Sequence, residues 1–108
     1  MDKNFEELEL RAYENDAEAQ YELAVYYKNK QINKSYVDWL KKSAKLNNSN
    51  AKVELAELYL QGVLIDKDED LAISLLEEEL EVNKNARLVL GKYNGNTRDE
   101  ENIKKGLD

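Results

Sequence analysis

A helical pattern occurs twice in this chain at a constant offset of 32 residues, and no other feature restricts the possible folds as much. The first copy, AEAQYELAVYY, starts at Ala17, and the second, SNAKVELAELY, starts at Ser49. Both copies place a small residue, a leucine, a second small residue and a tyrosine at matching positions: Ala19, Leu23, Ala24 and Tyr27, then Ala51, Leu55, Ala56 and Tyr59. This spacing puts the shared residues on one face of an α-helix. The sequence therefore predicts an array of similar helical units.

A third, incomplete copy follows 35 residues after the second. It keeps Ala86, Leu90 and Gly91, but Asn94 takes the place of the tyrosine. We therefore predict a degenerate or terminal unit in this part of the array.

A second helical pattern follows each of the two full copies, at Ser35–Leu46 and at Asp70–Val82. Each full repeat is therefore predicted to be an antiparallel helical hairpin, in agreement with the absence of proline. Phe5–Tyr13 predicts a leading helix and Asp99–Leu107 a short final one, which makes about seven helices. The predicted single domain covers residues 1–108, with the leading helix at 1–14, a first repeat at 16–47, a second at 48–83 and a truncated third at 84–107.

The chain contains no cysteine and no histidine, which excludes disulfides, the usual zinc sites, thiol nucleophiles and imidazole bases. It also has neither a glycine-rich phosphate loop nor a nucleophile elbow. We therefore expect no catalysis, no cofactor and no metal ion. The charged N-terminal segment and the lack of a long apolar run predict a cytoplasmic protein that does not enter a membrane.

The formal net charge of −7 is unevenly distributed. Residues 1–50 carry a balance of −1 and residues 51–108 a balance of −6. Between Glu54 and Glu81, ten acids accompany the single basic residue Lys67, if the ends are included. Such a field repels nucleic acid and anionic lipid and speeds encounter with basic surfaces. The expected partner is a basic protein, with no direct binding of nucleic acid.

These repeats resemble the Sel-one-like repeats (SLR), which are relatives of the tetratricopeptide repeats. Besides the shared first-helix residues, the matching positions are Trp39, Lys42, Ser43 and Ala44 in the first unit and Gly62, Asp68 and Ala72 in the second. The sequence departs from the family pattern at Ala24 and Ala56, which stand where the family has glycine. The resemblance covers residues 16–107 and implies an all-α fold. That fold is an α-solenoid of antiparallel helical hairpins whose first helices line a concave, protein-binding surface, generally without catalysis.

In such an array, one face of each first helix points into the concave groove. Tyr21, Val53 and Leu88 then form an apolar row across the three units, flanked by polar side chains, as is typical of a protein-binding site. The alternative is that a short superhelix buries this row as ordinary core. The predicted groove residues are Glu18, Tyr21, Val25, Lys28, Asn50, Val53, Glu57, Leu60, Asn85, Leu88 and Lys92.

A second candidate surface is acidic. Its glutamates are predicted to lie opposite the leucines of the second repeat's second helix, either as a simple solvated face or as a patch that steers a basic partner. The predicted acidic patch comprises Asp66, Asp68, Asp70, Glu77, Glu78, Glu79 and Glu81.

The stretch DKDEDLAISLLE, which starts at Asp66, has the acid spacing of an EF-hand calcium loop. Its sixth position, however, is Leu71, where the loop requires glycine in order to turn. The stretch fits the start of a helix better, with Asp66 and Glu69 at capping-box spacing and with Leu71, Leu75 and Leu76 turned into the core. Calcium binding is kept only as a remote alternative.

Two functions follow from these expectations. Small bacterial helical-repeat proteins that this chain resembles include immunity proteins, which implies a protein that neutralises a basic toxin such as a nuclease. The alternative is an adaptor that binds a peptide or helix in the groove. In either case we expect a monomer or a weak homodimer.

Overall fold

The computed structural model describes residues 3–94, which contain six α-helices and no strand. The first five are α1 (Lys3–Tyr13), α2 (Ala17–Asn29), α3 (Asn33–Lys45), α4 (Ser49–Gln61) and α5 (Glu69–Glu79). A sixth helix begins at residue 84 and is described to residue 94; it is called the 84–94 helix below. The predicted final helix, Asp99–Leu107, lies outside the described residues.

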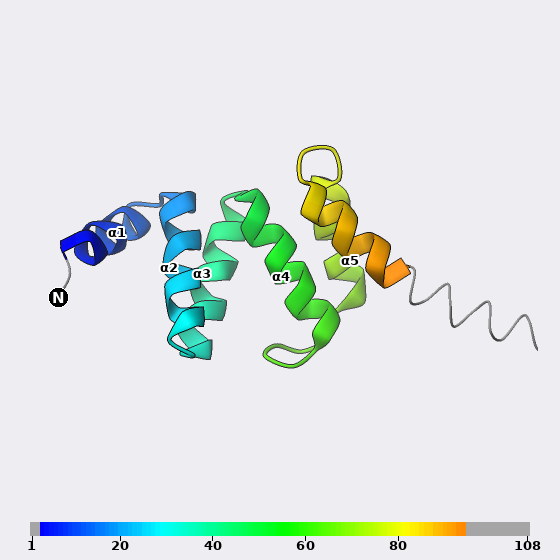
Figure 1. Ribbon diagram of the computed structural model, residues 1–108, viewed down its shortest axis with the longest axis horizontal. Helices are drawn as coiled ribbons and strands as arrows, with labels where there is room; N and C mark the ends of the chain where they lie inside the picture. The colour runs from blue at the N-terminus through cyan, green and yellow to red at the C-terminus, as the bar shows by residue number, and fades with distance from the viewer. Residues whose placement is uncertain (1–2, 95–108) are drawn as a thin grey trace, which may run out of the picture.

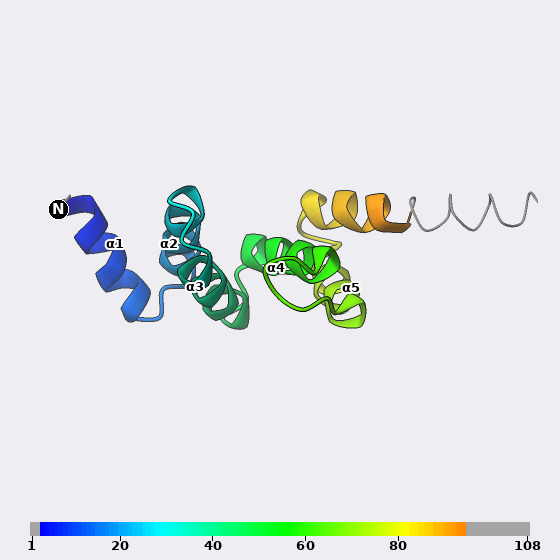
Figure 2. The same ribbon diagram turned by 90° about the horizontal axis from the view of Figure 1, so that it is seen from below.

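Consecutive helices pack against one another in an extended row that measures 62 × 28 × 18 Å (Figure 1). Figure 2 shows α2, α4 and the 84–94 helix toward one side of the row and α3 and α5 toward the other. This two-layer arrangement of antiparallel hairpins is an α-solenoid, so the predicted fold class is confirmed.

The repeated units begin with the same capping arrangement. Asp16 accepts a hydrogen bond from the backbone N–H of Ala19 at 3.1 Å, and Asn48 accepts one from Ala51 at 2.9 Å. Each side chain thereby satisfies a backbone donor that the first turn of a helix leaves open. The side chain of Asn83, three residues before Ala86, accepts a hydrogen bond of 2.9 Å from the backbone N–H of Asn85. The offsets of 32 and 35 residues between the sequence repeats therefore also separate the starts of α2, α4 and the 84–94 helix.

The small residues of the repeat are buried in the core. Ala24 and Ala56, which replace the family's glycine, are both completely buried. Alanine is therefore small enough at this position, because its single methyl group still permits close packing. The buried core forms two clusters, one over residues 12–58 and one that joins Val53 and Ala56 to Ala72, Leu76 and Ala86.

The start of α5 differs from its prediction. The N-cap is Asp68, whose side chain accepts a hydrogen bond from the N–H of Leu71 at 3.0 Å, so the predicted capping box of Asp66 and Glu69 is wrong. Leu71, predicted to face the core, is also 39% exposed, and its neighbour Ala72 is buried instead. Leu76 is buried, as predicted.

Candidate functional site

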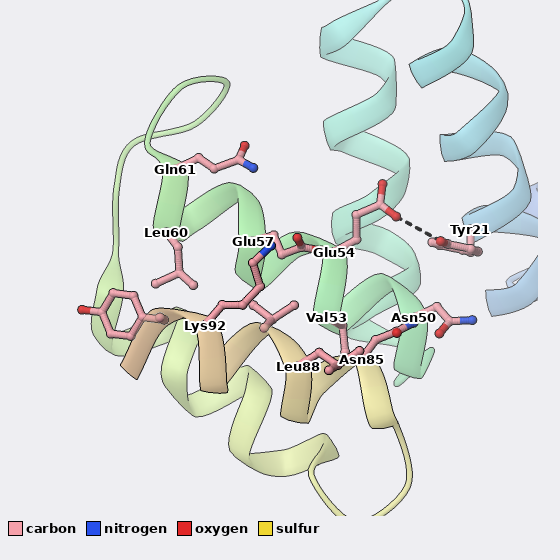
Figure 3. Close-up of a pocket in the computed structure, with 12 residues that line it drawn as sticks. Tyr21, Asn50, Val53, Glu54, Glu57, Leu60, Gln61, Asn85, Leu88 and Lys92 are labelled. Atoms are coloured by element: carbon pink, nitrogen blue, oxygen red, sulfur yellow. Dashed lines mark hydrogen bonds between the residues drawn. The ribbon is translucent and has the colours of Figure 1, made fainter. Parts of the chain in front are cut away.

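A groove of about 570 Å³ lies between α2, α4 and the 84–94 helix (Figure 3). One face of α4 supplies its long wall, because residues spaced by three or four positions share a face of a helix. The 84–94 helix supplies the opposite wall in the same way, and Tyr21 of α2 closes one end. The lining residues are Tyr21, Asn50, Val53, Glu54, Glu57, Leu60, Gln61, Asn85, Leu88, Val89, Lys92 and Tyr93.

The structure brings eight of the predicted groove residues together in this groove: Tyr21, Asn50, Val53, Glu57, Leu60, Asn85, Leu88 and Lys92. Glu18 and Val25 of α2 do not line it. Lys28 does not line it either, but its ammonium group lies 3.5 Å from the Glu54 carboxylate. The predicted positions thus converge in space, and their role in partner binding stays a prediction.

The predicted apolar row is not continuous at the surface. Val53 is only 4% exposed, because α4 packs this side chain into the cluster that contains Ala86. The prediction of an exposed row is therefore wrong at Val53. Leu88, on the facing helix, is 60% exposed, and the ring of Tyr21 is half-buried. Apolar surface is thus available to a partner at Leu88 and, in part, at Tyr21.

Glu54 is the main groove residue that the sequence prediction omitted. Its carboxylate accepts hydrogen bonds from the hydroxyl groups of Tyr21, at 3.0 Å, and of Tyr36, and it forms an ion pair with Lys28. These donors come from α2 and α3, so Glu54 joins the first repeat to the second.

The partly buried carboxylate of Glu54 raises the pKa values of its neighbours. Burial, followed by the charge of Glu54 and its hydrogen bond, raises the pKa of Tyr21 to about 12. Burial and the same carboxylate also raise the pKa of Tyr36. The pKa of Glu57 is raised, first by desolvation and then by Glu54, although Lys28 and Lys92 act in the opposite direction. Removal from water and the charge of Glu54 therefore outweigh the effect of the two lysines on Glu57.

The acidic patch is only partly a solvated face. Glu79 is 7% exposed and forms an ion pair with Lys52 at 3.3 Å, so its predicted place on the solvated face is wrong. Lys52, from α4, also pairs with Glu78 at 3.0 Å, and its pKa is raised chiefly by that hydrogen bond. The physical reason is that α4 packs against α5 and brings Lys52 to the C-terminal end of α5. The remaining patch residues, Asp66, Asp68, Asp70, Glu77 and Glu81, are exposed.

The acids of the EF-hand-like stretch do not gather into a metal-binding group. Within residues 3–94, no three acidic, histidine or cysteine side chains are placed so that they could hold a metal ion. Asp68 acts as a helix cap, and Asp70 lies in the first turn of α5. None of the described helices is both long and apolar enough to span a bilayer.

Comparison with known proteins agrees with this architecture. No family model matches the sequence, and a search of curated proteins finds no match. Among solved structures, the chain is similar to a Sel1 repeat protein from Oxalobacter formigenes, with 27% sequence identity and a TM-score of 0.75. The similarity covers 84% of this chain and 72% of that one. Arrays of this kind present extended concave surfaces and serve as protein-interaction modules. The chain therefore has the Sel1-like repeat fold, a tetratricopeptide-repeat-related α-solenoid.

Proposed function

We propose that this chain is a non-catalytic protein-binding module that holds a segment of one partner protein in the groove between α2, α4 and the 84–94 helix. The observation that carries the proposal is the exposure of Leu88, whose side chain is 60% accessible on a wall of that groove. An exposed leucine in a concave surface with a polar rim is typical of a site that a partner covers.

The other lining groups suit a polypeptide ligand. Asn50, Gln61 and Asn85 offer amide donors and acceptors to a backbone, and Leu60 and Val89 extend the apolar wall. All of these side chains stand on helices, so the groove is formed before the partner arrives and little ordering entropy is lost on binding.

The test uses a library of twelve-residue peptides displayed on phage and selected on the full chain. Affinities of selected peptides are then measured by calorimetry for the wild type, for Leu88→Ser and for Leu10→Ser. Leu10 is the matched control, because it is also 60% exposed but lies on α1 away from the groove.

We expect Leu88→Ser to weaken binding by about tenfold or more, which is the cost of losing one buried leucine contact. Leu10→Ser should leave affinity unchanged, and both variants should keep the wild-type circular dichroism. Peptides that bind the two variants equally well would refute the groove as the binding site.

A second candidate is an immunity-type protein that covers the basic surface of a toxin in the bacterial cytoplasm. It is favoured by the acids of α5 and of the loop before it, because Asp66, Asp70, Glu77 and Glu81 are exposed and form no ion pair within the described part of the chain. Such a face would steer a basic partner into place.

Co-expression tests this candidate. The chain should restore growth to cells that produce a toxin encoded next to its gene, and the combined change Asp70→Lys and Glu77→Lys should abolish that rescue. Groove-directed changes such as Leu88→Ser should leave rescue intact if the acidic face alone is responsible. Failure to rescue with the unaltered chain would exclude this role.

A further inference from the structure

We infer that the groove selects a partner segment that presents a lysine or arginine next to a bulky apolar side chain, with Glu57 meeting the cation and Leu88 meeting the apolar group. This inference rests on the proposed function and adds to it the chemistry of the partner. The two carboxylates of the groove, Glu54 and Glu57, differ in their surroundings.

Both oxygens of Glu54 already accept hydrogen bonds within the protein. One of its oxygens accepts from Tyr21, and the other accepts from Tyr36 and lies 3.5 Å from Lys28. A partner's cation would have to displace these donors to reach it. Glu54 is therefore a positioning residue, which holds the wall and contributes negative charge without receiving the ligand directly.

Glu57 stands three residues further along α4, on the same face of that helix. It is exposed, and within residues 3–94 it makes neither a hydrogen bond nor an ion pair. Lys92 acts on it only through its charge and does not approach within ion-pairing distance in the described structure. The carboxylate of Glu57 is thus free to receive a donor from outside.

Charge favours a basic side chain over an acidic one at this position. The negative charge of Glu54 adds to that of Glu57, and an arriving ammonium or guanidinium group relieves the repulsion between them. Neither Lys28, which pairs with Glu54, nor Lys92 forms an ion pair with Glu57 in the described residues.

The apolar half of the recognition lies on the facing helix. Figure 3 shows Leu88 on the 84–94 helix and Glu57 on α4, on the two walls of the groove. A segment lying between these walls therefore meets an apolar surface on one side and a carboxylate on the other. This arrangement matches a peptide whose basic residue adjoins a leucine-like one.

The experiment is a double-mutant cycle that combines one change in the protein with one change in the peptide. The peptides come from the phage selection described above. A selected peptide and its Lys→Gln or Arg→Gln derivative are each titrated into the wild type and into Glu57→Gln. We expect the loss of the peptide's cation to weaken binding to the wild type about two- to fivefold. The same change should have little effect on binding to Glu57→Gln.

Glu14→Gln is the matched control, because it removes the same charge from the exposed turn after α1, outside the groove. It should preserve the wild-type discrimination between the two peptides. Selected peptides without enriched lysine or arginine, or an unchanged discrimination in Glu57→Gln, would overturn the inference. If Leu88→Ser still weakened binding in that case, the proposed groove function would stand while the basic specificity failed.

Discussion

The hydroxyl group of Tyr21, on α2, donates a hydrogen bond of 3.0 Å to the carboxylate of Glu54, on α4. The two residues are 33 positions apart in the sequence, so this bond joins equivalent helices of consecutive repeats across one end of the groove (Figure 3). A hydrogen bond to an ionised acceptor contributes more than a neutral one. The pair therefore links the stability of the array to the geometry of its candidate site.

Removing this hydroxyl group should weaken the junction between the repeats. Tyr21→Phe is expected to lower the free energy of unfolding by about 1–2 kcal/mol, because a partly buried carboxylate loses one of its donors. Urea denaturation followed by circular dichroism measures this. Tyr26→Phe is the control, since the hydroxyl of Tyr26 makes no hydrogen bond among the described residues, and its stability should be unchanged. Equal stabilities of both variants would show that the bond contributes nothing.

Alkaline pH should loosen the same junction. The folded pKa of Tyr21, about 12, lies above its ordinary value of 10.0. The stabilisation is therefore fully present below pH 10 and is lost as the pH rises through about 12. Urea denaturation at increasing pH, with phenolate absorbance recorded in parallel, tests this. The decline should be shallower in Tyr21→Phe, where the raised pKa values of Tyr27, Tyr36 and Lys52 still contribute. An identical decline would contradict the assignment to Tyr21.

Lys52 offers a second test of a tertiary ion pair. It is 8% exposed and neutralises the buried Glu79, so Lys52→Met should destabilise the fold by about 2–3 kcal/mol by leaving that carboxylate unpaired. Lys34→Met removes the exposed pair with Asp38 on α3 and should cost less than about 0.5 kcal/mol. Thermal and urea unfolding of the two variants compares them. A similar loss of stability in both variants would mean that the buried ion pair contributes no more to folding than the exposed one.

Two glycines should respond to alanine in opposite directions. Gly62 ends α4 with φ at 66°, and an added Cβ would lie 2.9 Å from the Cβ of Lys67. Gly62→Ala should therefore cost about 1–2 kcal/mol. Gly91, within the 84–94 helix, has open space around it, and Gly91→Ala should stabilise the protein by about 0.5–1 kcal/mol. Midpoints of thermal unfolding that shift in the same direction would refute this contrast.

The helices could be predicted because their signal is local. Alanines and leucines at helical spacing, and the caps Asp16 and Asn48, depend only on neighbours within one or two turns. The same periodicity predicted most of the residues that line the groove, because a helix that buries one face in the core leaves its other faces to line the surface. The sequence did not identify the N-cap of α5, because Asp66 and Asp68 are chemically equivalent caps; in the structure the cap is Asp68.

The predictions of exposure were wrong where a different helix covers or pairs with the side chain. Glu79 looked like its neighbours Glu77 and Glu78, and its burial follows from the approach of Lys52 across the α4–α5 contact. Val53 fitted the groove face and is covered because the 84–94 helix packs over it.

Periodicity along the chain accounts for the repeat length, the helical hairpins and the face of each first helix that remains outside the core. The contrast between Glu54, which is held by Tyr21 and Tyr36, and Glu57, which is left free, arises only in the folded protein. Two glutamates on one helical face are equivalent in sequence, and they become different only when packing supplies hydrogen-bond donors to one of them.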